Sequence, residues 1–127
     1  MSSTGPTPIL IVEDEEEIRR ILIEFFTGND DYHVSSVPTG TDAVTFIDQG
    51  HDIGIVLLDI TLPGMNGIEV LKHIKLRHPN AAVIVLTSVM DKDIARQAVG
   101  LGAFDYVIKP PDLHYLESLV RACKLLR

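Results

Sequence analysis

Short apolar runs rich in β-branched residues recur along the chain and predict buried strands. Three runs of this kind cover residues 9–12, 53–58 and 82–86. Each run is too short for a typical helix and too uniformly apolar for a strand with one face in water, so we expect both faces to be covered. Residues 33–37 and 105–108 are further candidates because β-prone residues cluster in them. The pattern therefore predicts five strands.

Segments with helical spacing of apolar residues lie between these runs. Three of them place their apolar side chains on one helical face, at residues 18–25, 68–74 and 116–123. Two further segments, residues 39–49 and 91–101, are less periodic, but a glycine follows each of them, at a position where helices commonly end. Asp91 is expected to cap the second of these helices with its side chain.

Strands and helices thus alternate along the whole chain. Crossovers of this length give a parallel sheet with helices on both faces, so the expected fold is a doubly wound α/β fold with a five-stranded parallel sheet. A chain of 127 residues suits a single domain. We expect its core at about residues 8–126, after a flexible N-terminal segment at residues 1–7. Whether the chain is a complete protein or a domain of a longer one stays open at this point.

Charge and composition argue against several classes of function. The formal net charge is −7, from 11 basic and 18 acidic side chains, and the basic ones do not cluster, so direct binding of nucleic acid is not expected. The single cysteine, Cys123, allows no intrachain disulfide and fits a reducing compartment. The apolar runs are far shorter than the roughly 20 residues that span a bilayer. We therefore expect a cytoplasmic protein without a membrane segment.

Residues whose side chains can react or bind ligands lie where the predicted strands end. Ligands of open parallel sheets bind at the carboxyl ends of the strands. The residues at these ends are, in chain order, Glu13, Asp14, Asp59, Thr87 and Lys109. Three carboxylates, one hydroxyl and one ammonium group are therefore expected to share one rim of the sheet.

Carboxylates crowded in this way need a positive partner, because two of them about 4 Å apart repel each other by a few kcal/mol at an effective dielectric constant near 20. Oxygen ligands without clustered Cys or His favour Mg²⁺. Asp59, at the end of an apolar strand and beside such a metal, is placed to be a nucleophile toward phosphorus. The neighbouring acids at residues 15–17 are interpreted as a solvated first helical turn, and residues 63–64 as a turn before an N-cap at Asn66.

This set of residues resembles the receiver domains of two-component response regulators, the CheY-like proteins. The resemblance extends over residues 8–126, and the positions that carry it are Glu13, Asp14, Asp59, Pro63, Gly67, Thr87, Ser88, Tyr106, Lys109 and Pro110. It implies a flavodoxin-like strand order 2-1-3-4-5 and a signalling switch activated by phosphorylation. The chain departs from the common family pattern at Glu13, where Asp is more frequent, and at Pro111, where many members have an aromatic residue.

The resemblance also implies a phosphoacceptor and a metal site. Asp59 would accept the phosphoryl group. Asp14 and Asp59 would bind Mg²⁺ directly, Glu13 would act through metal-bound water, and the backbone carbonyl of Thr61 would be a further ligand. The three carboxylates would then be balanced by Mg²⁺ and one lysine.

The remaining implied roles concern the switch and its partners. Thr87 and Lys109 would contact phosphoryl oxygens, Tyr106 would be the switch aromatic, and the peptide bond between Lys109 and Pro110 is expected to be cis. A sensor histidine kinase or a histidine phosphotransfer protein would donate the phosphoryl group, and the output partner or effector domain is unknown. Phosphorylation-dependent dimerisation is left open. The chain would phosphorylate itself and slowly lose the group, so it would not be a turnover enzyme.

Three other interpretations compete with this one. A Mg²⁺-dependent aspartyl phosphatase of the haloacid dehalogenase type needs a second Asp two residues after its nucleophile, where this chain has Thr61, and room for a cap domain. A nucleotide-binding domain needs a Gly-rich loop after the first strand, where this chain has the acidic residues 13–17. The third is a receiver-like interaction module without phosphoryl chemistry, which the joint presence of Asp59, Thr87 and Lys109 disfavours.

Overall fold

The computed structural model describes residues 5–62 and 65–126, and the turn expected at residues 63–64 lies outside this part of the chain. The strands are β1 (Thr7–Val12), β2 (Tyr32–Val37), β3 (Ile55–Asp59), β4 (Ala82–Thr87) and β5 (Asp105–Ile108). The helices are α1 (Glu16–Thr27), α2 (Gly40–Asp48), α3 (Gly67–Arg77), α4 (Lys92–Gly100) and α5 (Leu113–Leu125), with a 3₁₀ turn η1 (Val89–Asp91) before α4.

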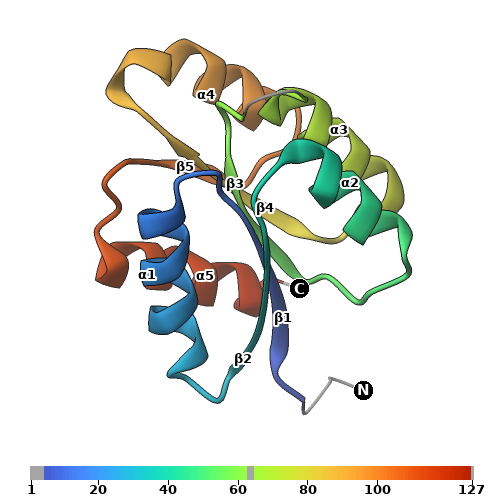
Figure 1. The fold of residues 1–127 in the computed structure, drawn as a ribbon, viewed down its shortest axis with the longest axis vertical. Coiled ribbons are helices and arrows are strands. Elements are labelled where there is room, and N and C mark those ends of the chain that lie inside the picture. The colour runs from blue at the N-terminus through green and yellow to red at the C-terminus, as the bar shows by residue number, and fades with distance from the viewer. Residues whose placement is uncertain (1–4, 63–64, 127) are drawn as a thin grey trace.

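The strands form one parallel sheet in the order β2-β1-β3-β4-β5, which confirms the expected fold. Figure 1 shows the strands of this sheet, in which β3 is the central one, between β1 and β4. The register pairs Asp59 with Leu86 and Thr87 with Ile108, so the carboxyl ends of β3, β4 and β5 lie side by side. The ends of the strands therefore gather the candidate residues at one edge, as the sequence predicted.

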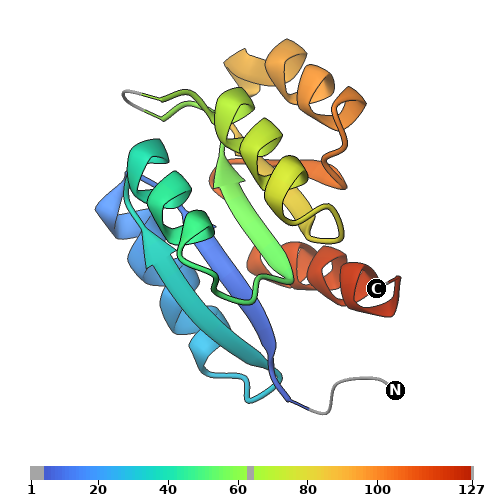
Figure 2. The same ribbon diagram turned by 90° about the vertical axis from the view of Figure 1, so that its right-hand side faces the viewer.

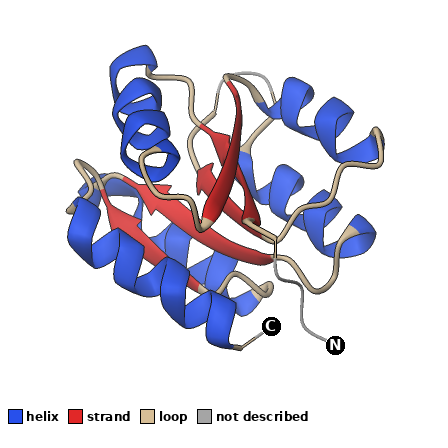
Figure 3. Cartoon of the chain, turned by 90° about the horizontal axis from the view of Figure 1, so that it is seen from below, coloured by secondary structure: helices blue, strands red, loops and turns tan. Residues whose placement is uncertain are grey.

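Helices cover both faces of the sheet (Figures 2 and 3). One face packs against α1 and α5, where Leu22, Phe26 and Leu116 meet strand residues such as Ile11 and Leu57. The opposite face packs against α2, α3 and α4, in a core whose strand residues are Leu10, Val12, Val56, Leu58, Val83 and Val85. Adjacent strand residues point to opposite faces and both faces are dry, which explains the uniformly apolar runs in the sequence.

The helix ends agree with most of the local sequence signals. The side chain of Asn66 caps α3 by accepting a hydrogen bond from the Glu69 N–H, as expected. Gly50 and Gly102 have φ angles of 84° and 113°, a region that glycine enters without strain, and they follow α2 and α4 as predicted. Asp91 is the exception. It occupies the N-cap position of α4 but makes no capping hydrogen bond, so the predicted role of its side chain is wrong.

Three further features bear on the sequence predictions. Strand β1 begins at Thr7, inside the segment expected to precede the core. Cys123 is buried on the inner face of α5 and forms no disulfide within the described part of the chain. None of the helices among the described residues has the length and apolar character needed to cross a membrane.

Candidate functional site

Three carboxylates converge where β1 and β3 end. One ligand oxygen each from Glu13, Asp14 and Asp59 lies within 4.8 Å of the others. Glu13 and Asp59 are almost completely buried, whereas Asp14 is exposed. The backbone N–H of Glu13 donates to the Val37 carbonyl, which extends the sheet pairing and fixes the loop after β1. The sequence therefore predicted correctly which acids come together.

Gly67 allows the loop after β3 to fold tightly behind Asp59. Its N–H donates to the Ile60 carbonyl oxygen at 3.1 Å. A Cβ atom at this position would lie 2.6 Å from the Ile60 Cα and 2.9 Å from the Asp59 carbonyl oxygen, closer than real Cβ atoms approach. Only glycine therefore lets the first turn of α3 pack directly against the end of β3.

Lys109 supplies the positive charge of the site. It follows β5, and its peptide bond to Pro110 is cis, as predicted. Its Nζ lies 2.8 Å from Glu15 Oε1, 3.2 Å from Glu13 Oε1 and 3.3 Å from Asp59 Oδ2. The ammonium group is largely buried, so these interactions are screened less than a surface ion pair would be.

Glu15 departs from the sequence interpretation. We interpreted it as part of a solvated first turn, but its carboxylate makes the shortest of the three contacts with Lys109. Its backbone N–H also donates to the Glu13 side chain at 3.0 Å. The carboxylate of Glu15 remains about half exposed. Lys109 is thus shared between two buried acids and one acid at the surface.

Burial and neighbouring charges shift the pKa values of the central pair. Burial, together with the nearby acids Asp14 and Glu13, raises the pKa of Asp59 to about 7, although the Thr61 N–H and the Lys109 charge act in the opposite direction. Burial alone would lower the pKa of Lys109, but Glu15, Asp59 and Glu13 raise it above its ordinary value. Lys109 is therefore a permanent cation, and Asp59 is poised between its neutral and ionised forms.

The other candidate residues surround this centre, and one of them, Thr61, donates a hydrogen bond to Asp59, as Lys109 does. The Thr61 N–H donates to Asp59 Oδ1 at 3.0 Å. Thr87 is fully buried, and its hydroxyl donates to the carbonyl oxygen of Ser88 at 3.2 Å. Tyr106 is half-buried and packs against the core that faces α2, α3 and α4. The structure thus brings Thr61 into contact with Asp59 and leaves the Thr87 hydroxyl on a backbone acceptor.

One interaction at this rim has no counterpart in the sequence predictions. Asp91 Oδ2 accepts hydrogen bonds from the Thr61 hydroxyl at 3.3 Å and from the Ser88 hydroxyl at 2.8 Å. The relation of Asp91 to Ser88 is local, and the spacing alone makes such a bond reasonable. Thr61 is far away in sequence, so only the folded sheet reveals that contact.

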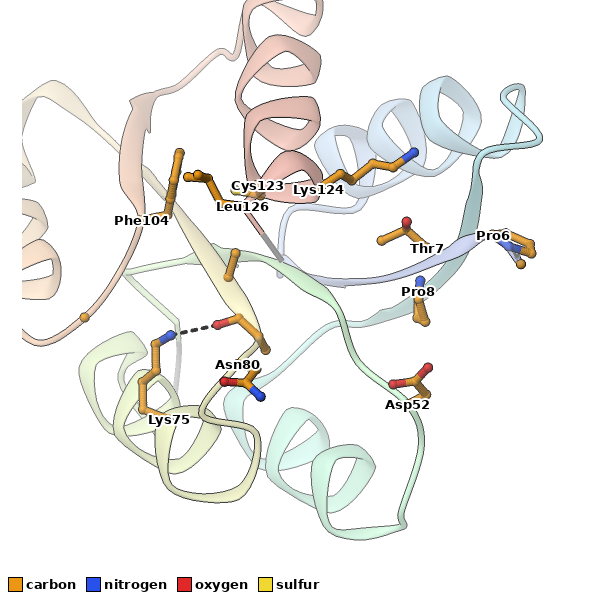
Figure 4. Close-up of a pocket in the computed structure, with 14 residues that line it drawn as sticks. Pro6, Thr7, Pro8, Asp52, Lys75, Asn80, Phe104, Cys123, Lys124 and Leu126 are labelled. Carbon is orange, nitrogen blue, oxygen red and sulfur yellow. Dashed lines mark hydrogen bonds between the residues drawn. The ribbon is translucent and has the colours of Figure 1, made fainter. Parts of the chain in front are cut away.

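A hollow of about 800 Å³ lies at the end of the sheet opposite to the acidic cluster, where β1 and β4 begin. Figure 4 shows its lining, with Lys75 and Asn80 on one side and Cys123 and Lys124 on the other. The Lys75 ammonium donates to the Ala81 carbonyl oxygen at 2.7 Å, and burial lowers the pKa of this lysine. The hollow holds neither the clustered acids nor Lys109, so its size does not make it the chemical site.

The acidic centre has the donors that a hard divalent cation requires. Carboxylate oxygens from two strand ends converge there, and no thiol or imidazole belongs to the group. This chemistry fits Mg²⁺, which takes one or two carboxylates with waters and phosphate oxygens. A buried carboxylate beside a lysine is also a suitable nucleophile once ionised.

Comparisons with known proteins agree with this geometry. The family described as the response regulator receiver domain matches residues 9–121. The regulatory protein AtoC of Escherichia coli (strain K12) is 36% identical over 118 residues, which is 93% of this chain and 25% of AtoC. The sporulation initiation phosphotransferase F of Bacillus subtilis (strain 168) is 34% identical over 113 residues, which covers 89% of this chain and 90% of that protein.

A solved structure shows the same likeness. The chain superposes on a CheX-CheY-BeF3-Mg²⁺ complex from Borrelia burgdorferi with a TM-score of 0.84 and 28% identity, over 93% of this chain and 89% of the other. The present chain thus spans about a quarter of AtoC but nearly the whole of the Bacillus protein.

Proposed function

The chain belongs to the response regulator receiver domain family of two-component signalling, and from this membership we propose that it is a switch operated by phosphorylation of Asp59. The proposed donor is a phosphohistidine on a sensor histidine kinase or on a histidine phosphotransfer protein. The observation that supports this most strongly is the buried Asp59 carboxylate, which lies beside two other acids and the Lys109 ammonium group.

Mg²⁺ is the proposed cofactor. Asp14 and Asp59 are the proposed direct ligands, with Glu13 acting through water and the Thr61 backbone carbonyl as a further ligand. When bound, Mg²⁺ supplies positive charge that neutralises the phosphoryl oxygens and aligns them for transfer. The charges support this assignment, because Mg²⁺ and Lys109 together balance three carboxylates.

The proposed reaction begins with ionised Asp59. One of its carboxylate oxygens attacks phosphorus, the P–N bond to the donor imidazole breaks, and the imidazole nitrogen keeps the electron pair and takes up a proton. Lys109 favours this attack because its charge lowers the pKa of Asp59. The ammonium group of Lys109 and the hydroxyl of Thr87 then hold phosphoryl oxygens. The product is an aspartyl phosphate, which the chain hydrolyses slowly, so the protein acts as a switch and not as a turnover enzyme.

The wider context is proposed on the same basis. Residues 8–126 form the proposed receiver unit, and its output passes to another protein or to a further domain. Longer relatives such as AtoC support that choice. The cytoplasm is the proposed compartment, because the single cysteine, Cys123, fits a reducing environment. Dimerisation on phosphorylation is one form that this output can take.

The phosphorylation proposal has a direct test. Wild-type protein is incubated with acetyl phosphate and Mg²⁺, and the adduct is mapped by mass spectrometry. We expect one phosphoryl group on Asp59, none on Asp59→Asn, and an unchanged yield for Asp93→Asn, a control acid that is almost fully exposed. Equal modification of Asp59→Asn would overturn the assignment, and no modification of the wild type would favour an interaction module without phosphoryl chemistry.

The proposed metal ligands are tested separately. Mg²⁺ is titrated by calorimetry against wild-type protein, Asp14→Ala and the control Asp93→Asn. We expect markedly weaker binding only for Asp14→Ala, because that variant removes a direct ligand. Equal affinity of all three proteins would remove Mg²⁺ from this cluster.

A further inference from the structure

We propose that Asp91 is a latch that ties the phosphoacceptor loop to the start of α4 and opens when Asp59 is phosphorylated. The opening step rests on the proposed function, whereas the closed latch does not. The carboxylate of Asp91 accepts from two hydroxyl groups on two different segments: Thr61, in the loop after β3, and Ser88, in the loop after β4. A single side chain therefore joins both loops to the residue from which α4 begins.

The latch connects directly to the phosphoacceptor. The Thr61 residue whose hydroxyl reaches Asp91 also donates its backbone N–H to Asp59 Oδ1 at 3.0 Å. On the other side, the Ser88 carbonyl accepts the Thr87 hydroxyl at 3.2 Å and the Asp91 N–H at 3.1 Å. Successive hydrogen bonds thus connect Asp59 through Thr61 and Asp91 to Ser88, the residue that follows Thr87 at the end of β4.

Hydrogen bonding, and not an ion pair, holds Asp91 in place. None of the ion pairs between described residues includes Asp91. Its carboxylate also does not cap α4, although that is the usual role of an Asp at this position. Both hydroxyls donate to Oδ2 of Asp91, so this side chain joins two loops without capping α4.

The helix that the latch holds is weakly anchored. Only Ala95 and Ala98 are fully buried among the described side chains of α4, whereas α3 buries Val70, Leu71 and Ile74. Two methyl groups bury little apolar area, so packing restrains α4 much less than it restrains α3. The hydrogen bond from Thr61 to Asp91 therefore adds a restraint from another loop at the start of a helix that has few buried contacts.

Phosphorylation opens the latch by competition for protons. A hydroxyl has one proton and donates it to one acceptor at a time. The phosphoryl group on Asp59 brings three strong acceptor oxygens next to Thr61, whose hydroxyl then leaves Asp91. Asp91 keeps only the local bond to Ser88, and the tie between the phosphoacceptor loop and α4 is broken.

The closed latch is tested by amide hydrogen exchange on the full chain, unmodified and free of Mg²⁺. We expect exchange in α4 to be roughly threefold to tenfold faster in Asp91→Ala, the range that follows from the net loss of about one ordinary intramolecular hydrogen bond. Asp91→Asn keeps an acceptor oxygen and should be intermediate. Gln97→Ala changes an exposed side chain of the same helix and should match the wild type. If amide exchange in α4 were as slow in Asp91→Ala as in the wild type, the latch would be overturned. If Asp91→Ala does not fold, the comparison of Asp91→Asn with the wild type decides.

A second arm separates a latch from a merely stabilising contact. Thr61→Val removes the hydroxyl but keeps the N–H that reaches Asp59. Asp91→Ala should therefore speed α4 exchange less in the Thr61→Val background than in the wild type. Equal effects in both backgrounds would show that Asp91 acts without Thr61 and would overturn the latch.

The opening step is tested with beryllofluoride and Mg²⁺. Wild-type α4 should exchange faster on activation, and Asp91→Ala should bind the same mimic with little further change, because its latch is already open. A full additional change in Asp91→Ala would overturn the opening mechanism. Failure of the wild type to bind the mimic would instead contradict the proposed function, and the unmodified arm would still decide whether the closed latch exists.

Discussion

At the scale of single residues, the site is organised by one cation that several acids share. Lys109 contacts Glu15, Glu13 and Asp59, and the shortest contact is with Glu15, which lies outside the buried centre. Before phosphorylation, the lysine is therefore held partly by an acid that is not part of the proposed reaction. When a phosphoryl group forms on Asp59, Glu15 competes with it for the same ammonium group.

We expect Glu15→Gln to speed phosphorylation of Asp59 by small donors, up to about fivefold. The partly exposed ion pair between Glu15 and Lys109 contributes about 0.2 to 1 kcal/mol, and its loss frees the lysine for phosphoryl oxygens. The measurement is the rate at which acetyl phosphate phosphorylates Asp59 in the intact protein. The extent of phosphorylation is followed by mass spectrometry of the tryptic peptide that contains Asp59. Glu16→Gln changes a neighbouring exposed acid and is the matched control. A slower rate in Glu15→Gln would mean that Glu15 orients Lys109 productively.

The raised pKa of Asp59 predicts how stability depends on pH in the absence of Mg²⁺. The ordinary value is 3.8 and the folded value is about 7, so the folded state binds the proton more tightly than the unfolded state. Between about pH 4 and pH 7 the folded state holds more protons, and stability therefore falls as the pH rises through this range. Ionised Asp59 is thus a source of instability, which a bound cation would relieve.

We expect Asp59→Asn to be more stable than the wild type at pH 8 in EDTA, and to lose this advantage near pH 4.5. The difference between the two pH values should be on the order of a few kcal/mol, since one pKa unit corresponds to about 1.36 kcal/mol. Urea denaturation at both pH values measures it, with Asp93→Asn as the exposed control. A difference that does not change with pH would contradict the raised pKa of Asp59.

At the scale of elements, most of the architecture follows from local sequence pattern, and the exceptions have physical causes. Strands with both faces buried must be apolar throughout, so their positions could be predicted from the runs alone. The cap at the beginning of α4 could not be predicted from the local pattern. An Asp before a helix normally caps it, but the hydroxyls of Ser88 and Thr61 take the carboxylate of Asp91 instead.

The candidate site shows the same division between local and long-range information. The end of each strand could be predicted, so the convergence of Glu13, Asp14 and Asp59 followed from parallel topology. The contact of Glu15 with Lys109 depends on where two loops meet in space, and no pattern along the chain indicates it. The same holds for Asp91, whose acceptor role depends on a residue from another loop.

The junction of β3 and α3 gives a prediction at this scale. We expect Gly67→Ala to destabilise the protein by roughly 1 to 3 kcal/mol, because its Cβ must displace backbone atoms of Ile60. The displacement also moves the end of β3, so phosphorylation of Asp59 should slow. Gly100→Ala is the matched control, since nothing lies within 4 Å of its Cβ position and alanine favours a helix. Thermal unfolding and the rate of phosphorylation by acetyl phosphate are measured for both variants. Unchanged stability and an unchanged rate in Gly67→Ala would contradict the prediction.

At the scale of the whole molecule, the end of β4 connects the chemical site with the α4–β5–α5 side. Thr87 is fully buried there, and the register pairs it with Ile108 on β5, two residues after Tyr106. Tyr106, Ile108 and Tyr115 line a hollow of about 420 Å³ on this side. The hydroxyl of Thr87 donates to a backbone carbonyl and is free to change to a phosphoryl oxygen as acceptor.

We therefore expect phosphorylation to reach this surface through Thr87 and Tyr106 as well as through α4. Movement of the Thr87 hydroxyl toward a phosphoryl oxygen leaves space into which the Tyr106 ring can turn, which changes the hollow beside Tyr115. Amide shifts of β5 on adding beryllofluoride and Mg²⁺ should appear in the wild type and in Thr87→Ser, which keeps the hydroxyl, and should shrink in Thr87→Ala. Equal shifts in all three proteins would exclude the hydroxyl as the link.

The size of this coupling limits what any partner can gain from the switch. Coupling free energies between sites are typically about 1 to 3 kcal/mol, or roughly 5-fold to 150-fold in affinity, and they are reciprocal. A protein that binds the phosphorylated α4–β5–α5 surface more tightly must therefore raise the affinity for beryllofluoride by the same factor. Thr87→Ala should lower both factors together, which calorimetric titrations in either order can measure. An unchanged coupling factor in Thr87→Ala would show that the Thr87 hydroxyl does not carry the coupling between the two sites.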